Sequence, residues 1–174
     1  MEVLLQKSVG KTTGWIGYTL SWAERQFDEI SFGKVFPAKY DRRHDLSITL
    51  SHKLNDNIDF GVTWVFGTGT SATLGTQVFN SPIFVDGLTN VFQQYNYYES
   101  RNNYRLPNSH RLDIGINFHK KKAYGIRTWN ISVYNVYNQK NPFLIFPSYQ
   151  NGSQVLKQYS LFPIIPSVSY TYKF

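Results

Sequence analysis

The chain contains 174 residues, of which 41% are hydrophobic, and its mean hydropathy of −0.37 excludes a helical membrane protein. No stretch approaches the ~20 consecutive apolar residues that a membrane-spanning helix needs. The absence of cysteine excludes a disulfide framework and thiolate metal sites. The net charge of +7 beside 13 Tyr, 13 Phe and 4 Trp also fits a single-strand nucleic-acid binder. Because the basic residues are scattered over predicted turns and strand ends, we expect no nucleic-acid partner.

Apolar and polar residues alternate with a period of two over segments of roughly ten residues, which predicts strands. In chain order we expect about seven strands, at residues 2–8, 12–24, 43–54, 58–69, 110–119, 127–137 and 157–174. Short turns are expected near 9–11, 55–57 and 120–125, and long connections near 25–42, 70–109 and 138–157. Prolines are confined to strand starts, edges or bulges, so Pro163 and Pro166 are interpreted as an irregular start of one long final strand.

Short turns at one end of a sheet and long loops at the other are typical of bacterial outer-membrane barrels. The alternative is a two-sheet sandwich, whose strands usually have about five or six residues. The predicted strands are longer, close to the ~9–11 residues that cross a bilayer at a tilt. We therefore predict an all-β fold, an antiparallel transmembrane β-barrel fragment. The chain alone is expected to form an open, curved sheet with two unpaired edges and an apolar convex face.

Four segments resemble the late barrel strands of TonB-dependent outer-membrane receptors, in the order of that family. Residues 36–45 resemble the motif before a late strand, and 105–113 resemble the lead into the antepenultimate strand. Residues 129–138 resemble the penultimate strand, and 157–174 the last. The final Tyr172-Lys173-Phe174 is similar to the terminal aromatic signature that the barrel-assembly machinery reads.

This resemblance implies that residues 1–174 are the C-terminal part of a receptor barrel of about 22 strands. The absence of a signal peptide at Met1 fits a fragment, and no plug domain or TonB-contacting segment is present. The implied location is the outer membrane of a Gram-negative cell, in contact with its lipid. The implied role is uptake of a scarce nutrient such as a siderophore, vitamin, glycan or peptide. The plug domain and TonB would be reached through the missing N-terminal part.

Two groups of residues are candidate contacts, the first for substrate or plug and the second for a ligand at the extracellular loops. The first consists of charged residues expected to face the lumen near the extracellular rim, with ion pairs bracing the barrel wall as the alternative: Asp41, Arg43, Asp45, Arg111 and Asp113. The second consists of aromatic residues in the longest loop, with a role as interfacial belt residues as the alternative: Phe92, Tyr95, Tyr97 and Tyr98.

No catalytic residue, metal site or cofactor is expected. Neither a Gly-x-Ser-x-Gly elbow nor a glycine-rich phosphate loop occurs. Gly67-Thr68-Gly69-Thr70 follows a predicted strand and is interpreted as a flexible exit into the long loop. The four histidines lie on separate strands without the close spacing of metal ligands.

The leading hypothesis is therefore a receptor barrel segment that takes part in transport and has no enzyme activity. A small complete outer-membrane barrel would instead close from these residues alone. A soluble carbohydrate-binding β-sandwich would be a water-soluble monomer without detergent. The transported substrate is left open by the sequence.

Overall fold

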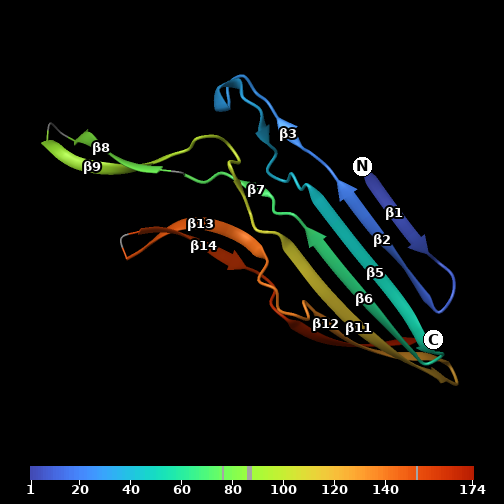
Figure 1. The fold of residues 1–174 in the computed structure, drawn as a ribbon. Helices are drawn as coiled ribbons and strands as arrows, with labels where there is room; N and C mark the ends of the chain where they lie inside the picture. Colours follow the sequence, from blue (N-terminus) through green and yellow to red (C-terminus); the bar gives the residue numbers. More distant parts are fainter. Residues whose placement is uncertain (76, 86–87, 152) are drawn as a thin grey trace.

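The computed structural model describes residues 1–75, 77–85, 88–151 and 153–174 (Figure 1). These residues form antiparallel strands and one short 3₁₀ helix, η1 (Ser31–Gly33). The prediction of an all-β, antiparallel fold is confirmed. Among the described residues, no helix has the length and hydropathy needed to span a membrane.

Seven strands form one large sheet, in which neighbours in sequence order are neighbours in space. The strands are β1 (Glu2–Lys7), β2 (Thr12–Leu20), β5 (His44–Asn55), β6 (Ile58–Gly67), β11 (Ser109–Lys122), β12 (Gly125–Tyr134) and β15 (Ile165–Lys173). Within the described residues the sheet is open, with β1 and β15 as its two edges. Each predicted strand has one counterpart in this sheet, although several of the bounds differ.

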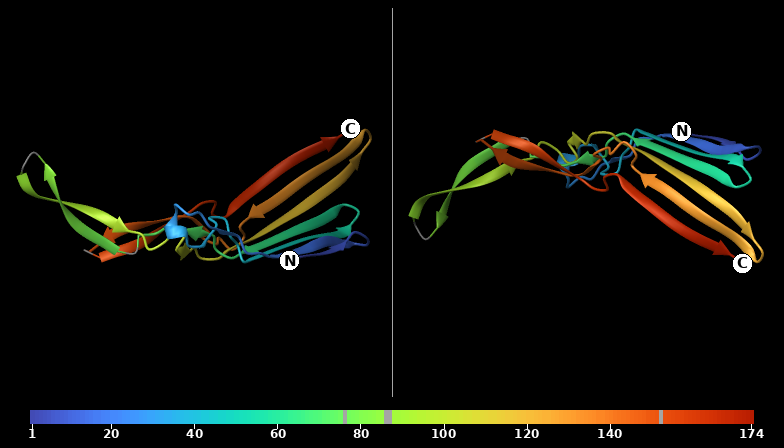
Figure 2. Two further views of the ribbon diagram at one scale, coloured as in Figure 1. Left: turned by 90° about the horizontal axis from the view of Figure 1, so that it is seen from above. Right: turned by 90° about the horizontal axis from the view of Figure 1, so that it is seen from below.

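The turns and connections divide between the two ends of the sheet. Figures 1 and 2 show the three short turns and the C-terminus at one end, and the long connections at the other. Small two-stranded sheets occupy the long connections, pairing β3 (Glu24–Arg25) with β4 (Phe36–Pro37), β7 (Ser71–Ala72) with β10 (Tyr104–Arg105), β8 (Gln77–Val85) with β9 (Leu88–Tyr97), and β13 (Pro142–Gln150) with β14 (Ser153–Ser160). The predicted asymmetry of turn lengths is confirmed.

The predicted continuous strand over 157–174 is wrong. Strand β14 ends at Ser160 and β15 begins at Ile165, so residues 161–164 separate two strands that belong to different sheets. Phe162 adopts a φ of 57°, in the left-handed region that a strand cannot contain. The strand predicted over 127–137 also stops early, at Tyr134, because Asn135 has a φ of 54°. Asn is one of the few residues that adopt this conformation readily.

The predicted turn over 120–125 is too long. Strand β11 continues through the lysine run, and Lys122 still pairs with Gly125. Only Ala123 and Tyr124 remain between the two strands. The lysine run therefore lies at the end of a long hairpin. At Gly125, a Cβ atom would lie 2.0 Å from the backbone oxygen of Lys173, so only glycine allows this close approach of the next strand.

The register gives the large sheet one apolar and one polar face. Residues paired directly across antiparallel strands share a face, and the rows Ile48–Trp64–Leu112, Leu50–Val62–Ile114–Val133 and Phe60–Ile116–Ile131–Val168 define the apolar face. The rows Thr49–Thr63–Asp113, Ser51–Gly61–Gly115–Ser132–Ser167 and Asp59–Asn117–Asn130–Ser169 define the polar face. A hollow of about 410 Å³ lies on the polar face, which makes this the inner side of the curved sheet.

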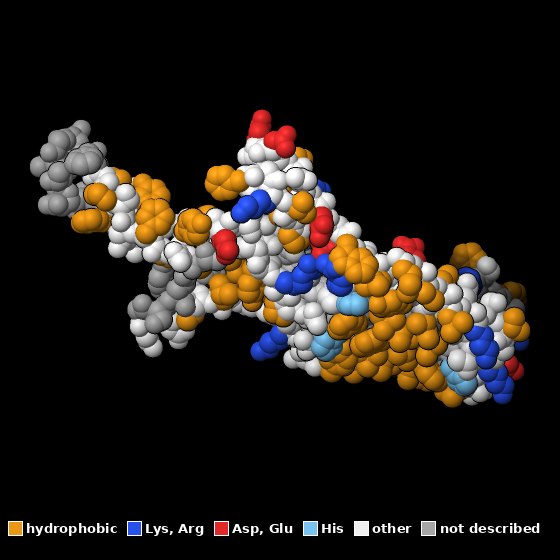
Figure 3. Space-filling model, turned by 45° about the horizontal axis from the view of Figure 1, so that its top comes forward, with side chains coloured by type: hydrophobic (Ala, Val, Ile, Leu, Met, Phe, Trp, Pro, Cys, Tyr) orange, Lys and Arg blue, Asp and Glu red, His pale blue; other side chains and the backbone are white. Residues whose placement is uncertain are grey.

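Within the described part of the chain, no second layer of structure covers the apolar face. Among the described residues, the only buried hydrophobic side chains are Phe36 and Leu74, and both lie in the long connections. On the apolar face itself, Leu50 is 41% exposed, Ile131 50% and Val168 64%. Figure 3 shows the hydrophobic side chains as one continuous surface over the sheet. In a compact soluble domain a second layer would cover such a face.

Candidate functional site

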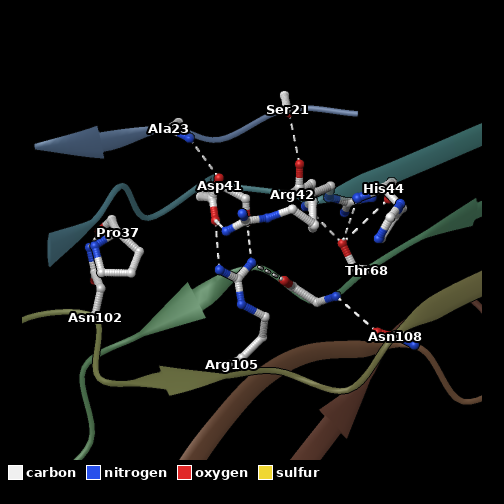
Figure 4. Close-up of polar contacts among 12 residues, drawn as sticks. Ser21, Ala23, Pro37, Asp41, Arg42, His44, Thr68, Asn102, Arg105 and Asn108 are labelled. Carbon is white, nitrogen blue, oxygen red and sulfur yellow. Dashed lines mark hydrogen bonds and ion pairs between the residues drawn. The ribbon is translucent and has the colours of Figure 1, made fainter. Parts of the chain in front are cut away.

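The predicted charged residues lie where the large sheet meets the long connections, and Asp41 is at their centre. Its carboxylate is 1% exposed and accepts hydrogen bonds from Arg105 Nη2 at 2.6 Å and from the Ala23 backbone N–H at 2.7 Å (Figure 4). Arg43 Nη2 lies 3.7 Å from the same carboxylate. We call these four residues the Asp41 cluster. It joins the connection before β5 to the connection before β11.

The Asp41 cluster keeps a buried carboxylate ionised. Burial alone would raise the pKa of Asp41, because it removes water from the charged form. The hydrogen bonds from Arg105 and Ala23, together with the charges of Arg105 and Arg43, outweigh this effect and lower the pKa below its ordinary value. Asp41 therefore acts as a permanently charged anchor at neutral pH.

Arg105 extends the cluster to the segment after β6. Its Nη1 donates to the backbone oxygen of Asp41 at 2.8 Å and to that of Gly69 at 3.0 Å. A Cβ atom at Gly69 would lie 1.6 Å from the Leu106 backbone oxygen, so this approach also requires glycine. Thr68 Oγ1 accepts the backbone N–H groups of Arg43 and His44 (Figure 4). The segment 67–70, interpreted as a flexible exit, is instead held by these hydrogen bonds.

Asp41, Arg43 and Asp45 divide between the strand β5 and the connection before it. Of the three predicted residues near position 43, only Asp45 belongs to β5, where it pairs with Arg42 at 3.6 Å. Asp41 and Arg43 precede the strand and belong to the Asp41 cluster. The guanidinium of Arg43 also lies 4.6 Å from the ring centre of Trp22.

Arg111 and Asp113 form a second group on the polar face, as neighbours on β11. Arg111 Nε donates to both carboxylate oxygens of Asp113, at 3.0 and 2.9 Å. Its Nη1 donates to the Tyr134 hydroxyl at 2.7 Å, and its guanidinium lies 4.2 Å from the centre of that ring. Asp113 also accepts the backbone N–H of Asn135, which is 1% exposed. This group fixes the end of β12.

A third group was not predicted. Asp59 on β6 is hydrogen-bonded to both Asn117 and His119 on β11, nearer the short turns. Asn130 donates to Asn117 at 2.8 Å, and Thr128 Oγ1 lies 2.8 Å from His119 Nδ1. The signal in the sequence was the placement of these residues at polar positions of three alternating strands. The contacts between them cannot be inferred from the sequence until the pairing register of these strands is known.

The predicted loop aromatics do not form one surface. Strand β9 carries Tyr95 and Tyr97 on one side and Phe92 on the other, because side chains alternate along a strand. Tyr95 stacks on Phe79 of β8, with ring centres 5.7 Å apart. Tyr98 follows the strand and is 53% exposed. These residues lie on a hairpin that extends away from the large sheet (Figure 1).

The histidines are hydrogen-bonded to hydroxyl groups on neighbouring strands and loops. The contacts join His44 to Tyr18, His52 to Thr12, His110 to Tyr137 and His119 to Thr128. Within the described part of the chain, no group of three His, Cys, Asp or Glu side chains is placed to hold a metal ion.

Comparison with known proteins identifies no relative. No protein-family model matches the sequence, and neither the curated proteins nor the solved structures contain a match.

Proposed function

We propose that this chain forms part of the wall of an outer-membrane transport barrel of the TonB-dependent receptor type. The apolar face of the large sheet contacts lipid, and the polar face lines the lumen. The observation that carries the proposal is the apolar face itself, which no element in the described chain covers. Large continuous apolar surfaces that are exposed mark sites of contact with a membrane or another molecule.

The distribution of side chains along the apolar face supports lipid as the contact. Leu, Ile and Val occupy its middle, as in the row Leu50–Val62–Ile114–Val133. Aromatic residues lie toward both ends, with Trp64 and Phe66 near the long connections and the row Phe118–Trp129–Tyr170 near the short turns. Membrane barrels show the same arrangement, an apolar band between two aromatic girdles.

The strand lengths also match a bilayer. On β11 the apolar positions lie between His110 and Lys120, a distance of roughly 34 Å at about 3.4 Å per residue. At a tilt of about 45° this segment spans about 24 Å along the membrane normal. The apolar band of outer-membrane barrels has a height of about 25 Å.

The proposal accounts for the polar face and the two edges of the sheet. Hydroxyl, amide and ion-paired groups lie on the polar face, on the inner side of the curved sheet, where water in a lumen can solvate them. Strands β1 and β15 would pair with further barrel strands, because unpaired edges lead to aggregation. The terminal Phe174 is fully exposed, as a residue that the assembly machinery reads would be. In this proposal the plug domain and TonB act from the N-terminal part of the receptor, and the chain catalyses no reaction.

A pair of arginine substitutions at adjacent positions tests the proposal. Ile131 lies on the apolar face and Ser132 on the polar face of β12. Arginine at the centre of a lipid face costs about 2–4 kcal/mol, whereas lumen positions tolerate charge. We therefore expect Ile131→Arg to reduce the amount of folded protein in the outer-membrane fraction and Ser132→Arg to leave it near that of the unmodified chain.

Two outcomes would contradict the proposal. One is that the two variants reach the outer membrane in equal amounts. The other is that the unmodified chain accumulates as a soluble monomer in the absence of detergent, which would favour a soluble β-domain.

A further inference from the structure

The long connections enclose a second feature, separate from the polar face of the sheet. A cavity of about 920 Å³ lies between the β3–β4 segment, β7, residues 101–102 and the start of β13. We call it the loop cavity. Its wall includes the cationic side chains of Arg25, Lys39 and Arg101. We infer that the loop cavity binds a small soluble anion that carries two or more carboxylate or phosphate groups.

The charge of the wall is the first observation behind this inference. Among its described lining residues there are three cations and no Asp or Glu. Elsewhere in the same region, the arginines have carboxylate partners, since Arg42 pairs with Asp45 while Arg43 and Arg105 share Asp41. In the described part of the chain, the three cations of the cavity wall form no such ion pair. Like charges gathered without a counter-charge attract an anion.

The second observation is that the three cations come from separate segments that are fixed to one another. The backbone N–H of Ser71 donates to the Lys39 oxygen at 3.1 Å. Asn102 Nδ2 donates to the Pro37 oxygen at 2.7 Å, next to Arg101 in the chain (Figure 4). Asp41, the centre of the Asp41 cluster, follows Lys39 and Tyr40 directly in sequence. A frame held in this way positions the charges before a ligand arrives, which lowers the entropy lost on binding.

The rest of the wall narrows the ligand class. Phe27 and Tyr40 supply exposed aromatic rings, and Lys39 Nζ lies 5.5 Å from the centre of the Tyr40 ring. Ser71, Thr73 and Asn102 add neutral polar groups. A compact molecule with several anionic groups around a ring or chain would contact both the cationic side chains and the aromatic and neutral polar groups of the wall. A single monovalent anion would leave two of the three cations without a partner.

The inference is independent of the proposed membrane role, because it concerns the long connections and a soluble ligand. It is tested by titration calorimetry on the full chain in detergent micelles. The probes are trimesate, a rigid aromatic tricarboxylate, and inorganic tripolyphosphate. Trimesamide, which has the same shape without charge, is the matched control ligand. We expect at least one of the two anions to bind with a Kd below about 1 mM and trimesamide to show no binding.

The variants are Arg25→Gln, Lys39→Gln and Arg101→Gln, each of which removes one charge. Each should weaken binding of the anion about tenfold, equivalent to about 1.4 kcal/mol. Lys121→Gln is the control, because it removes the same charge at the short-turn end of β11. Circular dichroism of every variant verifies that the sheet has formed.

Three results would overturn the inference. Neither anion binds the unmodified chain, trimesamide binds as tightly as trimesate, or Lys121→Gln weakens binding as much as the three cavity variants. The last result would show a general effect of net charge. Trimesate binding alone would assign a carboxylate ligand, and tripolyphosphate binding alone would assign a phosphate ligand.

Discussion

Replacing Arg105 by Met should loosen the long connections without unfolding the large sheet. The substitution removes three hydrogen bonds, two to Asp41 and one to the Gly69 backbone oxygen. It also leaves the buried Asp41 carboxylate with Arg43 at 3.7 Å as its cationic partner and the Ala23 backbone N–H at 2.7 Å as its donor. The Arg105 side chain is 36% exposed, but the carboxylate is buried, and leaving a buried charge without its partner destabilises by about 3–5 kcal/mol.

Arg43 still offsets part of this charge and the Ala23 N–H still donates to it, so we expect a loss of about 3 kcal/mol for local opening. At 1.4 kcal/mol per factor of ten, hydrogen exchange at the Ala23 and Leu106 amides should accelerate about 100-fold. Adding Asp41→Asn should recover part of this loss, since the buried charge is then removed as well. Exchange in β6 and β11 should not change.

Arg42→Met provides the matched control. Arg42 lies one residue from Asp41, but its partner Asp45 is 3.6 Å away and both side chains are more than 40% exposed. An exposed pair of this kind contributes about 0–1 kcal/mol. If exchange accelerates equally in Arg42→Met and Arg105→Met, burial is not what makes the Asp41 cluster strong, and the reasoning is refuted.

Three further predictions concern pH, strand packing and assembly. Because folding lowers the pKa of Asp41, its carboxylate should stabilise the connections fully at pH values above its unfolded-state pKa of 3.8. This stabilisation should be lost as the pH falls through the lower folded-state pKa. Hydrogen exchange at the Ala23 amide, measured as a function of pH, checks this. Gly125→Val should detach β15 from β12, whereas Gly115→Ala should not, because its Cβ would approach no atom closer than the Ser132 Cβ at 3.4 Å; thermal unfolding in micelles distinguishes them. Phe174→Ala should reduce the protein assembled in the outer membrane, and unchanged levels in the membrane fraction would count against the assembly signal.

The large sheet was predictable because the period of a strand is local. The alternation of apolar and polar residues, as over 46–50 and 112–118, indicates which side chains lie on opposite faces of a strand. The hairpin turns are also local, because each lies between two strands that are consecutive in sequence. The errors arose where local conformation overrides the pattern. The left-handed φ of Phe162 and Asn135 ends strands that composition alone would continue. The lysine run over 120–122 remains in a strand because exposed hairpin ends accept charge.

The sites were harder to predict because they depend on residues that are far apart in sequence. Asp41 and Arg105 are separated by 64 positions and meet through connections without alternation. Each residue is recognisable as charged in its own segment. The ion pair between Asp41 and Arg105 could not be inferred, because nothing in either segment identifies the other as its partner. The loop cavity combines four segments, and no local pattern relates Arg25 to Arg101. The polar network at Asp59 and His119 required the register of β6 and β11.

The central claim, that lipid covers the apolar face, is tested most directly by spin labels along β12. Because the chain has no cysteine, single cysteines at residues 129–133 can be labelled without background. In bilayers, labels at Trp129, Ile131 and Val133 should collide with dissolved oxygen, and those at Asn130 and Ser132 with a water-soluble nickel chelate. This alternation would support the proposed orientation. Equal access of the nickel chelate to both sets would contradict it, because the apolar face would then contact water.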